Sequence, residues 1–173
     1  MQDESEEPEG DVLAGMTCVS EVSSLAGDAL CVVPRDMDLK EVARQMWRWR
    51  QVRTAAVVDA EGRLAGIIPL RLLLDELFLR VAPEEFIADI FEPDHMEELG
   101  RMVRAEKAEE LMQPPVYVVL EDTVKDALCR MYEHKLEGLP IVDEEMRPVG
   151  CLDRFQLLEA SIREHGLRGT GSL

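Results

Sequence analysis

The sequence has too few basic residues for a protein that binds nucleic acid. It carries 19 Lys and Arg against 36 Asp and Glu, which gives a formal net charge of −17. A protein gains affinity for a phosphate backbone by releasing counterions, and that requires a surplus of cations. The composition therefore excludes nucleic acid and anionic membrane surfaces from the expected partners, while a strong charge of one sign favours solubility.

No hydrophobic run is long enough and free enough of charge to predict a membrane span. The most apolar stretch, residues 64–82, contains four charged side chains, which are too costly at membrane depth. We interpret it as a buried strand followed by an amphipathic helix and expect no membrane insertion. Residues 1–16 lack the basic and apolar regions of a targeting peptide, so we predict an acidic, disordered tail.

Patterns typical of catalysis and metal binding are also missing. Four cysteines stand singly, without a CxxC pair, and the three histidines are far apart, so we predict structural thiols and no metal site. Free thiols are typical of a reducing, cytoplasmic compartment. There is no nucleophile elbow, no paired Ser-His or Cys-His motif and no glycine-rich phosphate loop. We therefore predict that the protein is not an enzyme and requires no cofactor.

The sequence does contain an internal repeat. "AAVVDAEGRLAGIIP" (55–69) aligns with "LPIVDEEMRPVGCLD" (139–153) at an offset of 84, which pairs Gly66 with Gly150. Upstream of these segments, the alignment continues at an offset of 85 between residues 31–46 and 116–131. An internal repeat of this kind decides how the rest of the chain is read.

Each copy predicts the order β-α-β-β-α. A β-rich run, 31–34 or 116–120, precedes a helix that begins after Asp38 or Thr123, residue types that favour the N-cap. Two strands joined by a tight turn follow. The turn of the first copy contains Glu-Gly, whereas the second copy places Met146 there. We predict closing helices over 70–79 and from 155 to about 164.

A single copy is too small to be stable alone, because about 50–60 residues bury little surface and leave one face of the sheet uncovered. Two copies packed sheet to sheet would cover each other. We therefore predict an α/β (α+β) fold of tandem β-α-β-β-α repeats that form one pseudo-twofold module. The predicted parts are the tail 1–16, the first motif 17–80, a helical insertion 81–107, the second motif 108–165 and a flexible tail 166–173.

The segment "RMYEHKLEGLPIVDEEMRPVGCLDRFQLL" resembles the second half of a cystathionine-β-synthase (CBS) domain, where a helix precedes LP-hydrophobic-V-D, a turn and V-G-hydrophobic. "QMWRWRQVRTAAVVDAEGRLAGIIPLRLLL" is similar to the same motif, and two copies make a CBS pair, or Bateman module. The likeness covers residues 17–80 and 108–163. It implies a stand-alone regulatory module, a disc-like homodimer formed through the module's helices, and a regulated protein partner.

The resemblance also implies clefts that bind an adenosine-containing ligand: AMP, ADP, ATP or S-adenosylmethionine. The matching positions in the second copy, the main candidate site, are Val118, Val119, His134, Lys135, Gly138, Leu139, Pro140, Asp153 and Gln156. Those in the first copy, the weaker candidate, are Val33, Pro34, Arg53, Thr54, Ala55, Ala56 and Leu72, with Arg50 nearby.

Family members that bind nucleotides carry Thr/Ser-x-x-Asp after the second glycine strand, and its Asp holds the ribose hydroxyls. The first copy has Pro69-x-x-Leu72 there, and the second has Asp153-x-x-Gln156. Leu72 cannot bond a diol, while Gln156 offers a neutral, longer group. Asp153 would repel a phosphate, so the second site favours an uncharged or cationic adenosine ligand.

Several alternatives remain open at this point. His134 and Lys135 either contact a ligand or form a solvated helix end. Trp47 and Trp49 either stack on a base or cover an oligomer interface, and we favour the interface. The whole protein is alternatively a dimerisation and docking module with degenerate sites, or a divalent-cation sensor suited to its acidity.

Overall fold

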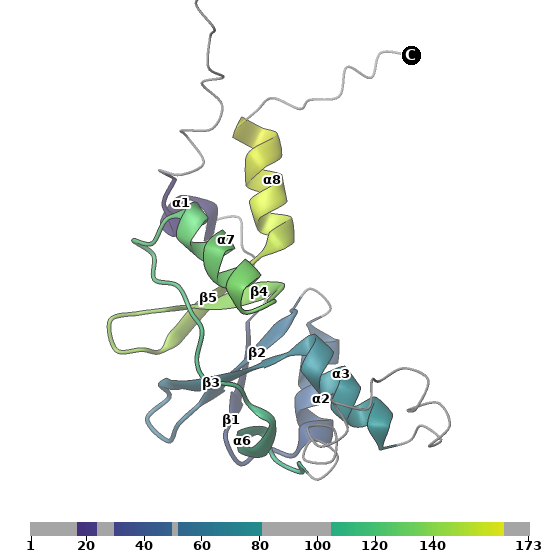
Figure 1. Cartoon of the computed structure of the whole chain (residues 1–173). Helices are drawn as coiled ribbons and strands as arrows, with labels where there is room; N and C mark the ends of the chain where they lie inside the picture. Colours follow the sequence, from purple (N-terminus) through teal and green to yellow (C-terminus); the bar gives the residue numbers. More distant parts are fainter. Residues whose placement is uncertain (1–16, 24–29, 50–51, 81–104, 165–173) are drawn as a thin grey trace, which may run out of the picture.

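The structure is a computed structural model that describes residues 17–23, 30–49, 52–80 and 105–164 (Figure 1). Both predicted tails, most of the predicted helical insertion and Arg50 lie outside the described residues.

The first copy contains a three-stranded sheet and two helices that pack side by side. Strand β1 (Cys31–Pro34) runs parallel to β2 (Thr54–Val58), and β3 (Leu64–Pro69) runs antiparallel to β2. Helix α2 (Leu39–Arg48) connects β1 to β2, and α3 (Leu70–Leu79) follows β3. The predicted order of elements is confirmed in this copy.

The second copy has the same order with a shorter sheet. Strand β4 (Gly138–Val142) pairs with β5 (Pro148–Asp153) in antiparallel orientation. Helix α7 (Val124–Glu133) precedes them, and α8 (Arg154–Glu164) follows. Figure 1 shows the two sheets one beside the other, each with its own pair of helices.

The predicted strand at 116–120 is wrong, because only Val118 pairs, as a single parallel bridge to Ile141. Immediately after this bridge the chain turns. The backbone N–H of Val119 donates to the Asp122 carboxylate at 3.0 Å, and the backbone N–H of Asp122 donates to the carbonyl of Val119 at 3.1 Å. Leu120, whose backbone groups would have extended the ladder, instead accepts the backbone N–H of Ser20 at 3.0 Å.

Capping side chains begin both central helices where the sequence predicts. The Asp38 carboxylate accepts the backbone N–H of Lys40 at 2.8 Å. Thr123 and Asp126 form a reciprocal capping box, since each side chain accepts the backbone N–H of the other residue. Such caps satisfy N–H groups that have no partner within the helix.

The two strand turns are also equivalent, although only one has glycine. Gly62 has φ +80° and Met146 has φ +65°, so a side chain occupies a conformation that normally favours glycine. In the second copy the Asp143 carboxylate accepts the backbone N–H groups of Glu145 and Arg147 at 2.9 and 2.8 Å. The Asp59 carboxylate accepts the backbone N–H groups of Glu61 and Arg63 in the same way, at 3.0 and 2.8 Å, so the two turns share these bonds.

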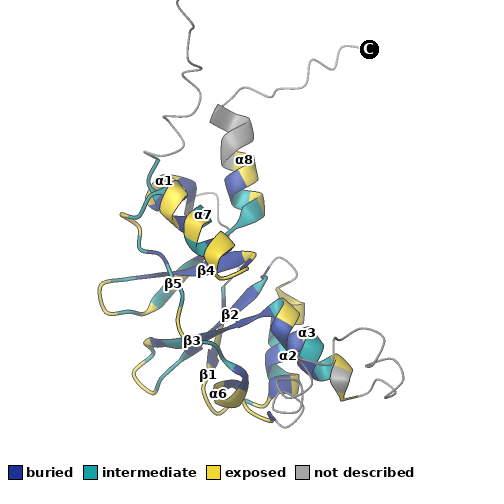
Figure 2. Ribbon diagram, in the orientation of Figure 1, coloured by how far each residue is buried: buried dark blue, intermediate teal, exposed yellow. Residues whose placement is uncertain are grey.

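The core shows why two copies are needed. In β2, Ala55 and Val57 face the helices of their own copy, whereas Ala56 belongs to a cluster built mainly from the second copy. Leu64 and Ile67 of β3 join the same cluster. Because strand side chains alternate between faces, one face of the first sheet packs across the seam between the copies. Figure 2 shows these strands as largely buried.

The leading segment of each copy packs on the other copy. Helix α1 (Val19–Ser23) contacts α8 and β5, and the backbone N–H of Val19 donates to the carbonyl of Asp122 at 2.8 Å. Helix α6 (Ala108–Leu111) packs in the core of the first copy, and the backbone N–H of Ala108 donates to the carbonyl of Met37 at 2.9 Å. This exchange ties the copies into one unit.

Candidate functional site

The two copies meet where β2 and β4 begin. The hydroxyl of Thr54 donates to the backbone carbonyl of Gly138 at 2.9 Å, and both residues are buried. Thr54 and Gly138 occupy equivalent positions in the repeat, so this bond lies close to the pseudo-twofold axis. It holds the starts of the two central strands together.

Next to this bond, a cavity of about 400 Å³ opens between the copies; we call it the seam pocket. The first copy contributes residues from the start of β2 and from the β3–α3 junction, and the second copy contributes residues that flank β4 and α8. The lining residues are Arg53, Pro69, Leu70, Arg71, Leu74, Lys135, Glu137 and Phe155. Two of the predicted cations, Arg53 and Lys135, therefore come together from different copies.

Backbone geometry positions these groups. The N–H of Leu70 donates to the carbonyl of Arg53 at 2.8 Å, and in the second copy the N–H of Arg154 donates to the carbonyl of Glu137 at 3.2 Å. Each bond holds the residue before a central strand against the start of a closing helix. Lys135 follows the end of α7 with φ +54°, which directs the chain back toward the seam.

The charge of the seam pocket is opposite to that of the whole protein. Its lining contains three cations, Arg53, Arg71 and Lys135, and one carboxylate, Glu137, whereas the chain as a whole has a formal net charge of −17. Clustered cations at the wall of a cavity favour an anionic group. The pocket is therefore suited to a phosphate or a carboxylate.

The two polar groups predicted for the second site serve the helix instead. The Gln156 side chain accepts the backbone N–H of Asp153 at 2.7 Å, and the Asp153 carboxylate accepts the backbone N–H of Gln156 at 2.9 Å. This is a capping box at the start of α8. Both side chains are thus committed to the backbone where the family pattern has a ribose ligand.

Other residues of the predicted second site are spread over several environments. Val118 and Leu139 are fully buried in the core that spans the seam, and Gly138 and Pro140 are buried in β4. Val119 is half-buried. His134 is exposed at the end of α7, where its ring nitrogen lies 4.0 Å from the Glu133 carboxylate.

The predicted first site is mostly core. Val33, Ala55 and Leu72 belong to the cluster beneath α2 and α3. Ala56 packs on the seam side, and Pro34 is exposed at the end of β1. Leu72, at the position where nucleotide-binding relatives would carry the ribose carboxylate, is therefore a packing residue.

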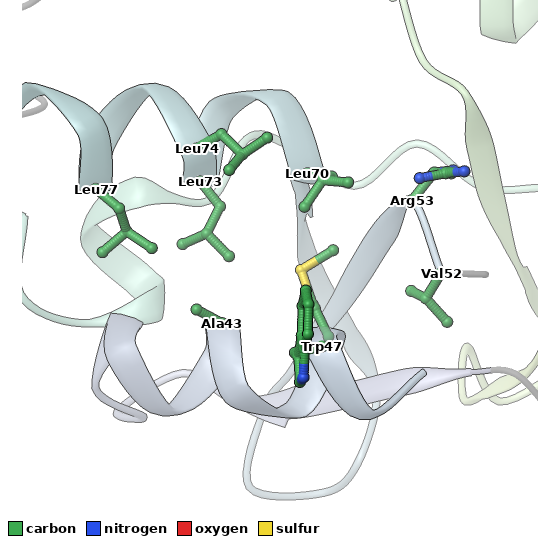
Figure 3. A pocket seen from close by; sticks show the side chains of 9 residues that line it. Ala43, Trp47, Val52, Arg53, Leu70, Leu73, Leu74 and Leu77 are labelled. Atoms are coloured by element: carbon green, nitrogen blue, oxygen red, sulfur yellow. The ribbon is translucent and has the colours of Figure 1, made fainter. Parts of the chain in front are cut away.

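A second cavity lies between the helices of the first copy (Figure 3). It has a volume of about 480 Å³, and we call it the α2–α3 groove. Its lining residues are Ala43, Met46, Trp47, Val52, Arg53, Leu70, Leu73, Leu74 and Leu77. Leu70, Leu73 and Leu77 of α3 point toward α2. The groove shares Arg53, Leu70 and Leu74 with the seam pocket. The two cavities therefore adjoin.

Sequence reasoning missed several lining residues of the seam pocket, among them Arg71, Glu137 and Phe155. The repeat contained a signal for them. Glu137 is the counterpart of Arg53, and Phe155 is the counterpart of Arg71, at the offset of 84. Residues near a pseudo-twofold axis approach their own counterparts, so an aligned pair beside a central strand predicts a shared site.

The buried thiols are poor nucleophiles. Burial raises the pKa of Cys31 to about 11, and burial together with the nearby negative charge of Asp153 raises the pKa of Cys151 to about 12. A thiolate is the reactive form of cysteine, so both residues act as small apolar side chains.

Two classes of feature are absent from the part of the chain that the structure describes. Within these residues, His, Cys, Asp and Glu side chains form no group of three that could hold a metal ion. None of the described helices combines the length and the apolar character needed to cross a membrane.

Comparison with known proteins adds a family and a fold. The CBS domain family matches residues 22–79 and 108–163. An uncharacterized protein of Methanocaldococcus jannaschii is 31% identical over 154 residues, which cover 76% of this chain and 85% of the relative. A CBS domain-containing protein from Thermotoga maritima aligns with a TM-score of 0.68 and 26% identity, over 84% of this chain and 94% of that chain.

The structure of CBSX2 in complex with AMP aligns with a TM-score of 0.63 over 86% of this chain and 98% of that chain. CBSX2 is a CBS-pair protein from Arabidopsis thaliana. The sequence identity is 19%, so this comparison supports the fold alone.

Proposed function

The chain belongs to the CBS domain family, and on that premise we propose that it is a regulatory module that senses a small molecule at the seam between its two copies. The ligand class is adenosine-containing compounds, and within that class we favour the adenine nucleotides AMP, ADP and ATP. The observation that carries the proposal is the seam pocket, where Arg53 of the first copy and Lys135 of the second line one cavity.

The pocket chemistry favours a nucleotide over S-adenosylmethionine. Three cations and one carboxylate suit a phosphate group, whereas the sulfonium of S-adenosylmethionine is itself a cation. This choice differs from the expectation drawn from Asp153, because the carboxylate of Asp153 caps α8. The cavity volume of about 400 Å³ falls in the range of small-molecule sites, roughly 300–1,000 Å³.

A ligand at this place would have a direct route to regulation. It would touch both copies, so it would favour the relative arrangement of the copies that places Arg53 and Lys135 around it. A ligand shifts an equilibrium by its difference in affinity for two states. The α3 and α8 helices begin at the pocket wall and would transmit the shift.

Calorimetry with AMP, ATP, adenosine and S-adenosylmethionine tests the proposal. We expect AMP and ATP to bind and adenosine to bind more weakly, because it lacks the phosphate. Arg53→Ala and Lys135→Ala should each weaken AMP by roughly 10- to 100-fold, the effect of losing a charge-assisted bond of about 1.5–3 kcal/mol.

Arg63→Ala is the matched control, because Arg63 lies in the strand turn, paired with Asp59 at 3.3 Å, and does not line the pocket. The proposal is contradicted if no compound releases heat, or if AMP binds equally to wild type and to the Arg53 and Lys135 variants.

A second candidate function is a dimerisation and docking module whose ligand sites are degenerate. The burial of Leu72 and the capping role of Gln156 favour it. Under this alternative His134→Ala and Gln156→Ala would leave the assembly unchanged, whereas Trp47→Ala would weaken it. Sedimentation of the three variants separates this alternative from a ligand sensor.

We also propose that the module is a homodimer formed through its helices, which carry exposed large apolar side chains in both copies: Trp47, Leu74, Phe78, Tyr132, Phe155 and Leu158. Large apolar side chains exposed on one pair of helices after another are a feature of protein interfaces. A regulated protein partner would read the ligand state from the assembled module. All four cysteines are free thiols, which fits a cytoplasmic location.

A further inference from the structure

The lining of the seam pocket contains two pairs of equivalent residues. Arg53 of the first copy corresponds to Glu137 of the second, and Arg71 corresponds to Phe155, both at the offset of 84. A cavity beside a pseudo-twofold axis has matching halves when the two copies carry the same residues. Both of these pairs are unlike, so the two halves of the pocket differ in chemistry.

The cations of the pocket are available to a ligand. Neither Arg53 nor Lys135 forms an ion pair with a residue that the structure describes. Arg71 pairs with Asp75 on the same helix at 3.3 Å, and the Arg71 side chain is largely exposed. An exposed pair of this kind contributes little to stability, so a phosphate can recruit Arg71 at small cost. We call Arg53, Arg71 and Lys135 the phosphate end of the pocket.

Glu137 is the single carboxylate among the lining residues, and it is exposed. The ion pair that it makes is loose, because its carboxylate lies 3.6 Å from the Arg154 guanidinium, beyond the length of a good hydrogen bond. An ionised carboxylate accepts hydrogen bonds through both oxygens and donates none. Glu137 therefore suits a part of the ligand that carries hydroxyl groups.

Phe155 lines the same pocket and is 69% exposed. An exposed aromatic ring at the wall of a cavity offers a surface on which a nucleobase stacks. Phe155 lies between Asp153 and Gln156, whose reciprocal capping bonds hold the first turn of α8. The ring is therefore attached to a fixed turn of the backbone, as a stacking surface requires.

From this unlike lining we propose that the seam pocket holds one nucleotide per chain in a single orientation. The phosphate lies at the phosphate end, the ribose hydroxyls donate to Glu137, and the base stacks on Phe155. The inference rests on the proposed nucleotide sensor and adds two residues that determine its specificity. The reverse orientation would place the phosphate beside the carboxylate of Glu137, and like charges cost affinity.

The alternative role for Glu137 is that it only repels the phosphate. The two roles predict opposite results for Glu137→Gln, which removes the charge and keeps the size of the side chain. If Glu137 repels the phosphate, the variant binds AMP more tightly than wild type does. If Glu137 accepts the ribose hydroxyls, the variant binds AMP more weakly, because a neutral amide is a poorer acceptor than a carboxylate. AMP without its 2′- and 3′-hydroxyls then loses no affinity.

Calorimetry of the full chain with AMP, 2′,3′-dideoxy-AMP and ribose 5-phosphate tests both residues. We expect one AMP per chain. Glu137→Gln should weaken AMP about 10-fold and should not weaken 2′,3′-dideoxy-AMP. Phe155→Ala should weaken AMP about 10-fold and leave ribose 5-phosphate unchanged, because that compound has no base. Glu145→Gln and Phe78→Ala are the matched controls, since both residues are exposed and neither lines the pocket. Thermal melting checks that each variant folds.

The outcomes separate this inference from the proposed function. If wild type binds none of the three compounds, the nucleotide sensor and the orientation are both overturned. If AMP binds and depends on Arg53 and Lys135, but Glu137→Gln binds AMP as tightly as wild type or more tightly, the role of Glu137 alone is overturned. An equal loss of AMP and ribose 5-phosphate in Phe155→Ala would overturn the stacking of the base.

Discussion

The two copies differ least in their backbone pairing and most at the positions where a ligand would bind. The pair Val57–Gly66 in the first copy recurs as Ile141–Gly150 in the second, and the register of both hairpins shifts at the next residue, Val58 or Val142. The four-residue sequences after the second glycine strand, in contrast, have unlike roles. Leu72 is core in one copy, and Gln156 is a cap in the other.

The repeat preserves the residues that the two sheets need in order to pack, and the remaining positions differ between the copies. One face of each sheet must be covered by the other copy, and that requirement fixes the apolar positions on both sides of the seam. Polar positions beside the seam carry no such requirement. At one such aligned pair, Arg53 of the first copy and Glu137 of the second, the charge is reversed.

The largest difference in stability should come from substitutions at Leu72 and Gln156, the equivalent positions where the sequence predicted ligand contacts. Leu72→Ala should destabilise the protein by about 2–5 kcal/mol, because it opens a cavity among buried residues. Gln156→Ala should cost only about 1 kcal/mol, the loss of a cap. Urea unfolding measures both. An unchanged stability for Leu72→Ala would contradict its assignment to the core.

The next largest difference should be between alanine substitutions at the two equivalent strand glycines, Gly66 and Gly150. An added Cβ at Gly66 would lie 2.7 Å from the backbone oxygen of Gln113 and 2.7 Å from the sulfur of Met112, whereas at Gly150 the nearest atom is the end of the Ile141 side chain at 3.4 Å. Gly66→Ala should therefore cost about 1–3 kcal/mol, and Gly150→Ala should stay within about 0.5 kcal/mol.

Thermal melting of both glycine variants makes the measurement. Each 1 kcal/mol should lower the melting temperature by about 2–4 °C in a protein of this size. Equal shifts for the two variants would show that segment 112–113 does not lie against β3 as described.

Loss of the hydrogen bond between Thr54 and Gly138 should have a smaller effect on stability. Thr54→Val keeps the shape of the side chain but removes the hydroxyl that donates to Gly138, and it leaves that buried carbonyl without the donor. We expect a loss of about 1–2 kcal/mol. Thr54→Ser retains the donor and is the control. If valine is as stable as threonine, the bond does not contribute to closure of the seam.

The smallest effect concerns acid stability of the α7 cap. A hydrogen bond from Thr123 lowers the pKa of Asp126. Because the folded pKa lies below the unfolded one, this carboxylate stabilises the fold above the ordinary Asp range and loses that contribution as pH falls through its folded pKa. Asp126→Asn should thus be less stable than wild type at pH 7, and by a smaller margin at pH 3.

Urea unfolding at both pH values measures this difference. Glu41→Gln, at the equivalent position of α2, is the matched variant. Glu41 pairs with Arg44 at the surface, at 2.9 Å, and such pairs contribute little. A constant gap between wild type and Asp126→Asn across the pH range would contradict the role of the Asp126 charge.

Local signals in the sequence predicted much of the fold. Asp38 and Thr123 are N-caps as expected, the closing helix of the first copy runs over Leu70–Leu79, and the turn at Met146 takes the conformation of the glycine turn. All of these depend on residues a few positions apart. Short-range chemistry of this kind is readable without the fold.

The sequence could not predict features in which a side chain can bond either to a neighbouring residue or to one far along the chain. From the sequence, the side chains of Asp153 and Gln156 could either line a cleft or cap the helix that follows. In the structure both bond to backbone N–H groups at the start of α8. The exchange of α1 and α6 between the copies is equally non-local. The seam pocket combines residues about 80 positions apart, and only the repeat alignment connects Arg53 to Glu137 in the sequence.

A crystal structure of the protein with AMP tests the central claim most directly. We predict electron density for one nucleotide in the seam pocket, with its phosphate within hydrogen-bonding distance of Arg53 and Lys135, so that both copies touch a single ligand. A nucleotide bound within one copy alone, or a pocket that stays empty at saturating AMP, would contradict the account.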